Sequence, residues 1–185
     1  MSIELTVITT APRTRRFLLS DPAAVAQVCE SLRNGGRLFS GKPLIIGSAG
    51  RTEVFAATSI ACLELATDIE LDEYLPKPTN LTLTALPPGQ CTEPFVGRFE
   101  GERFTVRVEF RFTGGHKLVT RVDGVRKPVL AERVMNLTSL FERPLLDYRL
   151  TQRGVGLMNP HAVTQFVITP GVPDLPKDAW LADVT

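Results

Sequence analysis

The stretch FTVRVEFRF, residues 104–112, alternates apolar and polar side chains along its whole length. Successive side chains of a β-strand point to opposite faces, so this period of two predicts a strand with one buried face and one solvated face. The turn signal TGGH follows at 113–116. The next segment, KLVTRVDG at 117–124, is therefore predicted to return beside the first strand as an antiparallel hairpin partner.

Outward from this hairpin, most of the chain has the composition of strands. Strand-like runs bounded by glycine and proline are predicted at IELTVIT (3–9), PLIIGSAG (43–50), TEVFAATSIACLELAT (52–67), NLTLTAL (80–86), LLDYRL (145–150) and AVTQFVIT (162–169). The long run at 52–67 is expected to bend or bulge midway. The segment APRTRR, 11–16, is interpreted as a polar break, and MNLTSLF, 135–141, fits either a strand or a short helix.

One segment has the signals of a helix. Asp21 is the predicted N-cap, and Pro22 follows at the first helical position, where a missing N–H costs nothing. Apolar residues then recur at helical spacing, and Asn34 with the glycines after it provides the stop. The apolar stripe consists of Val25, Val28, Cys29 and Leu32. A helix with one apolar face is expected to cover one side of a sheet or one end of a barrel.

These elements predict a mainly β fold of the α+β class, a small antiparallel β-barrel or split barrel with one N-terminal capping helix. The expected organisation is a β-rich domain at 1–150 that contains the helix at 21–34. A C-terminal strand and a proline-rich extended arm are expected at 151–185. The arm is a candidate contact between copies of the chain, with Trp180 and Leu181 as its anchor.

Composition narrows the function classes. The chain has 185 residues and a net charge of +1, so no overall field recruits nucleic acid or a membrane. Its three cysteines are far apart in the sequence and include no CxxC pair, which indicates reduced thiols rather than a zinc site or a redox pair. No apolar run approaches the roughly 20 residues of a membrane span, and no signal-peptide pattern is present. We therefore expect a cytoplasmic protein without a metal or cofactor.

The sequence has no catalytic constellation that we recognise. His116 and His161 lie in predicted turns, and neither has a nucleophile motif beside it. The glycine-containing GSAGRT at 47–52 lacks the spacing of a phosphate-binding loop. The acidic cluster at 68–73 lacks the glycine and the terminal glutamate of a calcium-binding loop. The expectation is a protein that is not an enzyme.

The arginines are the candidate functional residues. Arg107 and Arg111 share the polar face of the strand at 104–112, and Arg121 lies on its predicted hairpin neighbour. Guanidinium groups on a sheet face suit phosphate groups or acidic partners, although the same pattern is typical of a solvated strand face. The full set of predicted partner or anion contacts is Arg107, Arg111, Arg121, Arg15, Arg16 and Arg149.

The order of segments resembles the N-terminal domain of YcgR-type flagellar brake proteins, the domain that precedes PilZ. FLLSDPAAVAQVCESLRNGGRL (17–38) resembles that family's helix, and EVFAATSIACLELATD (53–68) its strand pair before an acidic stretch. NLTLTAL and GERFTVRVEF resemble the two strands that follow, and DYRL (147–150) falls at the family's arginine-rich junction. The later (D/N)xSxxG motif of the cyclic di-GMP site is missing, and too few residues follow position 150 for a PilZ barrel. The resemblance implies a split-barrel-like domain that contacts proteins, without a nucleotide site of its own.

Two functions follow as hypotheses. The first is a non-enzymatic protein-interaction module, regulatory and related to cyclic di-GMP and flagellar signalling. The alternative is an RNA-binding subunit of a ribonucleoprotein complex with a ferredoxin-like, CRISPR-type fold, in which RGVGLMNPH (153–161) would lie near the RNA backbone. The low net charge argues against the alternative, because backbone binding needs a clustered positive surface.

Overall fold

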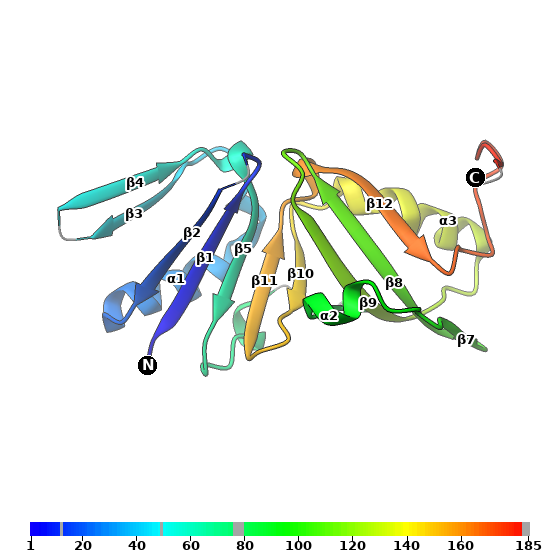
Figure 1. Ribbon diagram of the computed structural model, residues 1–185, viewed down its shortest axis with the longest axis horizontal. Helices are drawn as coiled ribbons and strands as arrows, with labels where there is room; N and C mark the ends of the chain where they lie inside the picture. Colours follow the sequence, from blue (N-terminus) through cyan, green and yellow to red (C-terminus); the bar gives the residue numbers. More distant parts are fainter. Residues whose placement is uncertain (12, 49, 76–79, 183–185) are drawn as a thin grey trace.

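The computed structural model describes residues 1–11, 13–48, 50–75 and 80–182. Strands account for 43% of the chain and helices for 21%, which confirms the mainly β, α+β class. The described strands form one large sheet of ten strands and a separate two-stranded sheet. Figure 1 shows two halves side by side, with the N-terminal strands in one and the hairpin at 103–125 in the other.

The large sheet runs in the order β12-β8-β9-β6-β10-β11-β5-β1-β2, with the short β7 also paired to β8. Its neighbours are antiparallel except for β10 and β6, which are parallel and are joined at Arg149 and Thr84. The strands are β1 (Ile3–Thr9), β2 (Thr14–Leu19), β5 (Ile60–Ala66), β6 (Leu81–Ala85), β7 (Arg98–Glu100), β8 (Arg103–Phe112), β9 (Lys117–Val125), β10 (Leu146–Arg149), β11 (Gly154–Met158) and β12 (Val163–Thr169). The second sheet is the hairpin of β3 (Leu44–Ser48) and β4 (Arg51–Phe55).

The sheet is open, so the closed barrel considered from the sequence does not form. Strands β2 and β12 lie at opposite ends of the strand order and do not pair with each other. The physical reason is that the apolar residues divide into two separate clusters. Each half buries its own apolar face against other elements, and closure of the sheet is not needed to remove that surface from water.

Helix α1 (Pro22–Arg33) covers the core of the N-terminal half, as the sequence predicted. The Asp21 side chain accepts a hydrogen bond from the backbone N–H of Ala24 at 2.9 Å, which caps the helix. The helix buries Val25, Cys29 and Leu32. They pack against the inner side chains of β1, β5 and β11, among them Ile3, Leu5, Val7, Leu63, Leu65, Val155 and Leu157.

The hairpin of β8 and β9 builds the core of the C-terminal half. Its register places Phe110 opposite Leu118 and Val106 opposite Val122, so the predicted apolar face is buried. Phe104 at the start of β8 is only partly buried and packs at the margin of this core. Helix α2 (Pro88–Cys91) precedes β7, and helix α3 (Leu130–Thr138) lies between β9 and β10. Short 3₁₀ turns complete the described chain at Gly35–Arg37, Ala57–Ser59, Asp72–Tyr74, Ser139–Glu142 and Pro160–Ala162.

Several boundaries differ from the prediction. The segment expected to be a polar break contains the start of β2, in which Arg15 shares the partly buried face with Phe17 and Leu19 while Arg16 is exposed. The long run at 52–67 divides into β4, a 3₁₀ turn and β5, which fits the expected bend. Residues 130–138 form helix α3, and a 3₁₀ turn follows, so 135–141 does not form a strand.

Two strands, β11 and β12, follow residue 150, and both pair within the large sheet. After Thr169 the chain continues as an arm without regular secondary structure. Trp180 at its end is 98% exposed and does not anchor the arm. Among the described helices, none has both the length and the apolar character needed to cross a membrane.

Candidate partner-binding surface

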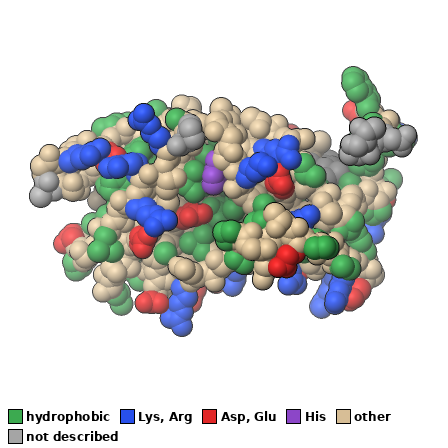
Figure 2. Space-filling view, viewed as in Figure 1, with side chains coloured by type: hydrophobic (Ala, Val, Ile, Leu, Met, Phe, Trp, Pro, Cys, Tyr) green, Lys and Arg blue, Asp and Glu red, His purple; other side chains and the backbone are tan. Residues whose placement is uncertain are grey.

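The outer face of β7, β8 and β9 presents most of the predicted arginines of the C-terminal half. The register places Arg107 directly opposite Arg121, while β7 aligns Arg98 with Thr105. Cationic side chains outnumber carboxylates at the outward positions: Arg98, Arg103, Arg107, Arg111, Lys117 and Arg121 against Glu100, Glu109 and Asp123. Figure 2 shows Lys and Arg side chains with acidic ones between them over this half, and again over the β3–β4 hairpin.

Arg107 is half-buried and holds a loop in place. Its Nη1 donates to the carbonyl of Glu93 at 2.8 Å and to that of Cys91 at 3.4 Å. Its guanidinium also lies 5.7 Å from the ring centroid of Phe95, within the range of a cation–π contact. These contacts fasten the loop after α2 to β8, so Arg107 supports the surface rather than offering a free cation.

Arg111 and Arg121 are exposed but paired. Arg111 Nε donates to Glu109 Oε1 at 2.6 Å, and this hydrogen bond holds the pKa of the Glu109 carboxyl below its usual value. Arg121 Nη2 lies 2.9 Å from Asp123 Oδ1, which also accepts from the Thr105 hydroxyl at 2.6 Å. Exposed pairs of this kind contribute little stability, so a partner's carboxylate can compete for the arginines.

Arg98 and Arg103 are exposed, and within the described residues neither forms an ion pair. They border an open hollow of about 410 Å³ together with Arg121. Val96, at the rim of this hollow, is 81% exposed. Neither arginine belongs to the predicted site set. The signal that could have included them is the alternation that continues from β8 back through its turn into β7, which puts both arginines on the same outer face as Arg121.

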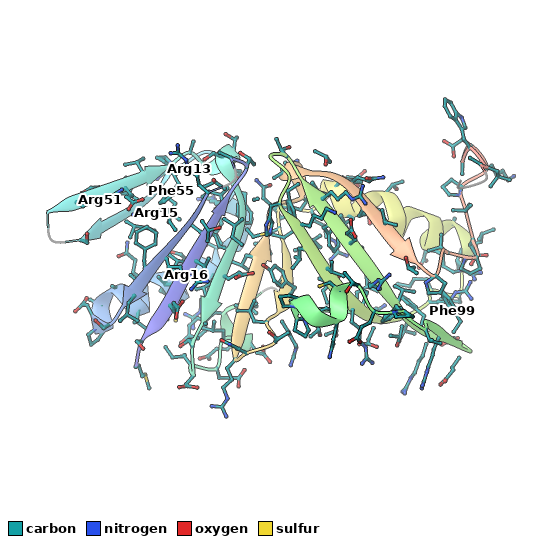
Figure 3. The ribbon with its side chains drawn as sticks, in the orientation of Figure 1. Arg13, Arg15, Arg16, Arg51, Phe55 and Phe99 are labelled. Carbon is teal, nitrogen blue, oxygen red and sulfur yellow. The ribbon has the colours of Figure 1, made fainter. Side chains whose placement is uncertain are left out.

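Arg15 and Arg16 lie in the other half, on β2. Arg15 binds both carboxylate oxygens of Glu53 on β4, with Nε 2.9 Å from Oε2, and this hydrogen bond lowers the pKa of Glu53. Arg51 approaches the same carboxylate at 3.2 Å. Figure 3 shows Arg15, Arg51 and Phe55 close together between β2 and the β3–β4 hairpin, with Arg16 further down the strand. This cluster joins the small sheet to the large one.

Arg149 is separate from both groups. It is exposed on β10, and its Nη2 lies 3.8 Å from Asp72 Oδ2, beyond hydrogen-bond distance. The structure thus brings Arg107, Arg111 and Arg121 onto one surface and leaves Arg15, Arg16 and Arg149 elsewhere. Their binding role stays a prediction.

The buried tyrosine and cysteine of the core do not form a reactive site. Tyr148, which is 1% exposed, donates its hydroxyl to Glu64 Oε1 at 3.0 Å beside the buried Cys62. Burial raises the pKa of both the Cys62 thiol and the Tyr148 hydroxyl, so both stay protonated at neutral pH and neither is an activated nucleophile. No group of three or more His, Cys, Asp or Glu side chains in the described part of the chain is placed to hold a metal ion.

The two histidines lie apart from these groups. His116 is partly buried and contacts Phe112 at a centroid distance of 5.4 Å, and this burial lowers the pKa of its imidazole. His161 is exposed in the 3₁₀ turn before β12. No family model, curated protein or solved structure matches this chain, so the candidate surface rests on its own geometry.

Proposed function

We propose that this chain is a non-enzymatic interaction module that binds an acidic segment of a partner protein on the outer face of β7, β8 and β9. The observation that carries the proposal is the hollow of about 410 Å³ that is lined by Arg98, Arg103 and Arg121 together with Glu100 and the exposed Val96. Arg98 and Arg103 form no ion pair within the described residues, and Arg121 is held by Asp123. Such arginines beside an exposed apolar side chain are suited to a peptide that carries both carboxylates and an apolar residue.

The chemistry of the surface favours carboxylates. A guanidinium presents several N–H donors in a plane, which matches the two oxygens of a carboxylate. The apolar rim contributed by Phe95 and Val96 would add contact area and exclude water from those hydrogen bonds. Glu100 also lines the hollow, so it would repel a uniformly acidic ligand and favour one whose carboxylates lie beside the arginines.

The resemblance to the N-terminal domain of YcgR-type flagellar brake proteins supports the same class of function. It implies a domain that contacts other proteins and leaves nucleotide binding to a separate domain. A regulatory role in cyclic di-GMP or flagellar signalling is therefore part of the proposal, with a component of that signalling system as the partner.

The test is an affinity purification from the native host with charge-reversed variants. Arg98→Glu with Arg103→Glu alters the hollow, and neither residue makes an ion pair that holds the described fold together. The matched control is Arg13→Glu with Arg37→Glu, two exposed arginines of the other half that are not among the predicted contacts. Arg107 is unsuitable for this test, because its loss releases the loop at 91–93. Bound proteins are identified by mass spectrometry, and nucleic acid is extracted from a parallel sample.

We expect one protein to be retained by the wild type and by the control, and to be lost from the Arg98/Arg103 variant. Its retention should fall with rising salt, because exposed charge pairs are screened. Retention of the same proteins by both variants would refute the assignment of the surface. A discrete RNA that depends on Arg98 and Arg103 would replace the proposal with the ribonucleoprotein alternative.

The C-terminal arm is the proposed contact between copies, because Trp180 and Leu181 at its end are exposed apolar side chains. Light scattering coupled to size exclusion tests this part. A multimer that becomes a monomer in Trp180→Ala supports it, and a monomeric wild-type protein at high concentration contradicts it.

A further inference from the structure

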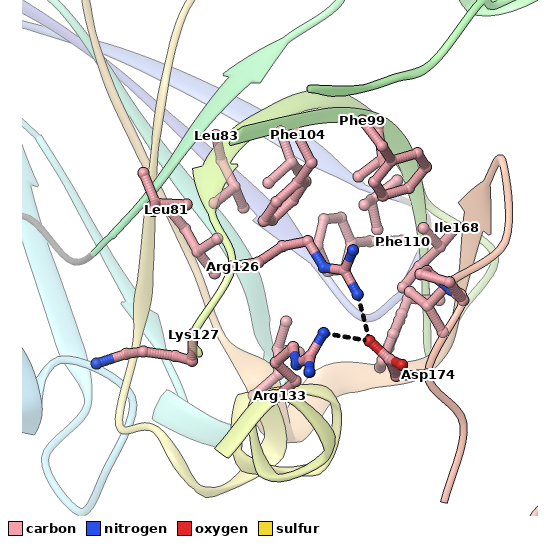
Figure 4. Close-up of a pocket in the computed structure, with 18 residues that line it drawn as sticks. Leu81, Leu83, Phe99, Phe104, Phe110, Arg126, Lys127, Arg133, Ile168 and Asp174 are labelled. Atoms are coloured by element: carbon pink, nitrogen blue, oxygen red, sulfur yellow. Dashed lines mark hydrogen bonds and ion pairs between the residues drawn. The ribbon is translucent and has the colours of Figure 1, made fainter. Parts of the chain in front are cut away.

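A second cavity lies on the inner face of the same half of the molecule. It has a volume of about 160 Å³ and opens beside the arm that follows β12. Its walls are almost entirely apolar (Figure 4). They include Leu83, Phe104, Val106, Phe110, Phe166 and Ile168. An apolar cavity of about 150 Å³ is large enough to hold benzene, so this one accommodates a group of phenyl size.

The polar groups of the cavity lie together at one end. Arg126, which follows β9, and Arg133 on α3 both bind the same oxygen of Asp174, with Arg133 Nη1 2.8 Å from Oδ2. Figure 4 shows both guanidinium groups directed toward this carboxylate. The Nε of Arg133 is buried and has no hydrogen-bond partner among the described residues. Lys127 also lines the cavity, but its Nζ lies 3.8 Å from Glu132 Oε2, so the excess positive charge at this end comes from the two arginines that share Asp174.

This end of the cavity is short of acceptors. Two partly buried guanidinium groups share one carboxylate oxygen, and a buried donor is left without a partner among the described residues. Buried donors without a partner are costly, and they are rare in native proteins. Asp174 binds both arginines through its Oδ2 atom alone. A ligand carboxylate that offered one oxygen to each guanidinium would satisfy more of these donors.

Asp174 itself comes from the arm. The arm has no regular secondary structure. In the described structure its Asp174 pairs with Arg126 and Arg133, and its Val172 and Pro173 line the cavity. Its end is exposed at Trp180. A side chain held in this way can be exchanged for a ligand carboxylate without disturbing the sheet.

We propose that the cavity binds a small carboxylate with a phenyl-sized apolar group. The apolar group occupies the cavity between β6, β8, β9 and β12, and the carboxylate takes the place of Asp174 between Arg126 and Arg133. Binding then releases the arm, so the arm and the ligand compete for the same pair of arginines. This proposal is independent of the outer surface on β7, β8 and β9.

The experiment uses three probes that differ in their head group only: 3-phenylpropanoate, 3-phenylpropan-1-ol and 3-phenylpropylamine. Binding to the whole chain is measured by titration calorimetry and by chemical-shift changes in NMR spectra. We expect the carboxylate to bind at least tenfold more tightly than the alcohol, and the amine to bind least. Equal affinity for the three probes, or no binding of the carboxylate up to 10 mM (roughly the weakest useful affinity), overturns the proposal.

Different variants test the polar end and the apolar part of the cavity. Arg126→Gln with Arg133→Gln should remove the preference for the carboxylate, whereas Arg37→Gln, at an exposed position outside the cavity, should keep it. Ile168→Phe, on the edge strand, should weaken all three probes by filling the cavity. Circular dichroism establishes that each variant is folded. Carboxylate preference that survives the double arginine variant would refute the assignment of the head-group end.

The decisive variant is Asp174→Asn, which removes the competing charge and keeps the size of the side chain. We expect it to tighten carboxylate binding severalfold and to leave binding of the alcohol unchanged. In the wild type the carboxylate should also narrow the NMR signal of the Trp180 indole, as the released arm becomes more mobile. Weaker carboxylate binding in Asp174→Asn would overturn the competition between arm and ligand.

Discussion

The contact between Gly156 and Tyr148 supports a quantitative prediction. These residues face each other across β10 and β11, and a Cβ atom at position 156 would lie within 3.0 Å of three carbons of the Tyr148 ring. The ring cannot move aside easily, because Tyr148 is 1% exposed and its hydroxyl is hydrogen-bonded to Glu64 at 3.0 Å. Gly156→Ala therefore either strains the sheet or expels the ring.

The expected cost follows from these two routes. Overpacking of a tight core costs about 1–3 kcal/mol, and the loss of a buried aromatic ring about 3–5 kcal/mol. Because the ring is almost fully buried and its hydroxyl is hydrogen-bonded to Glu64, we expect a cost between these two ranges, about 3 kcal/mol. For a chain of this size that lowers the melting temperature by roughly 6–12 °C.

Urea unfolding followed by circular dichroism measures this change. The control is Gly47→Ala in strand β3, where an added Cβ meets nothing within 4 Å and where we expect a change within about 0.5 kcal/mol. A double-mutant cycle isolates the contact: in a Tyr148→Ala background, Gly156→Ala should cost close to nothing. A cost below about 1 kcal/mol in the wild-type background, or an equal cost in both backgrounds, would refute the reasoning.

Three further predictions concern single positions. The imidazole of His116 should titrate in NMR spectra with a pKa below the ordinary histidine value of 6.5. The folded state then binds fewer protons than the unfolded chain, so the stability of the fold should decrease as the pH drops through 6.5. A measured pKa above 6.5 contradicts this prediction. Asp21→Ala should cost about 1 kcal/mol in urea unfolding by loss of the helix cap, and Asp21→Asn much less. Gly114→Ala should lower the free energy of unfolding more than Gly115→Ala does. Both glycines have a positive φ, which costs an alanine about 1–2 kcal/mol, but only the Cβ at position 114 meets the Thr10 carbonyl. Equal melting temperatures of the two variants would contradict this prediction.

Local pattern was enough to predict the elements with strong periodicity. Strands β1, β8 and β9 and helix α1 lie where alternation and capping residues placed them, because burial of one face selects for the period of each element. Strand β2 was missed because Arg15 takes one of its three inward positions and Leu18 one of its outward ones, so the segment shows no alternation of apolar and polar residues. The short β7 was missed for a similar reason, since three residues are too few to show a period.

The partners of each strand and of each arginine could not be predicted from pattern. The apolar run of β5 predicts a strand, and the structure buries it on both faces, but the run does not show that its neighbours come from residues 3–9 and 154–158. Arg107 was predicted to lie on an open strand face, and its loop contacts depend on where residues 91–93 return. The arginines at the apolar cavity are held by Asp174, which is far away in the sequence. Such contacts follow from the tertiary arrangement.

The central position of β5 has a consequence for synthesis of the protein. Its two neighbours are β1, made before it, and β11, which ends at Met158. On the ribosome, roughly 90 further residues must be added before β11 exists, which takes about 5–20 s at ordinary elongation rates. During that time the nascent chain carries an apolar strand with one bare edge, the kind of surface that pairs with other chains. Folding of this protein without aggregation thus depends on whether residues 60–66 are kept from pairing with other chains until translation has passed residue 158.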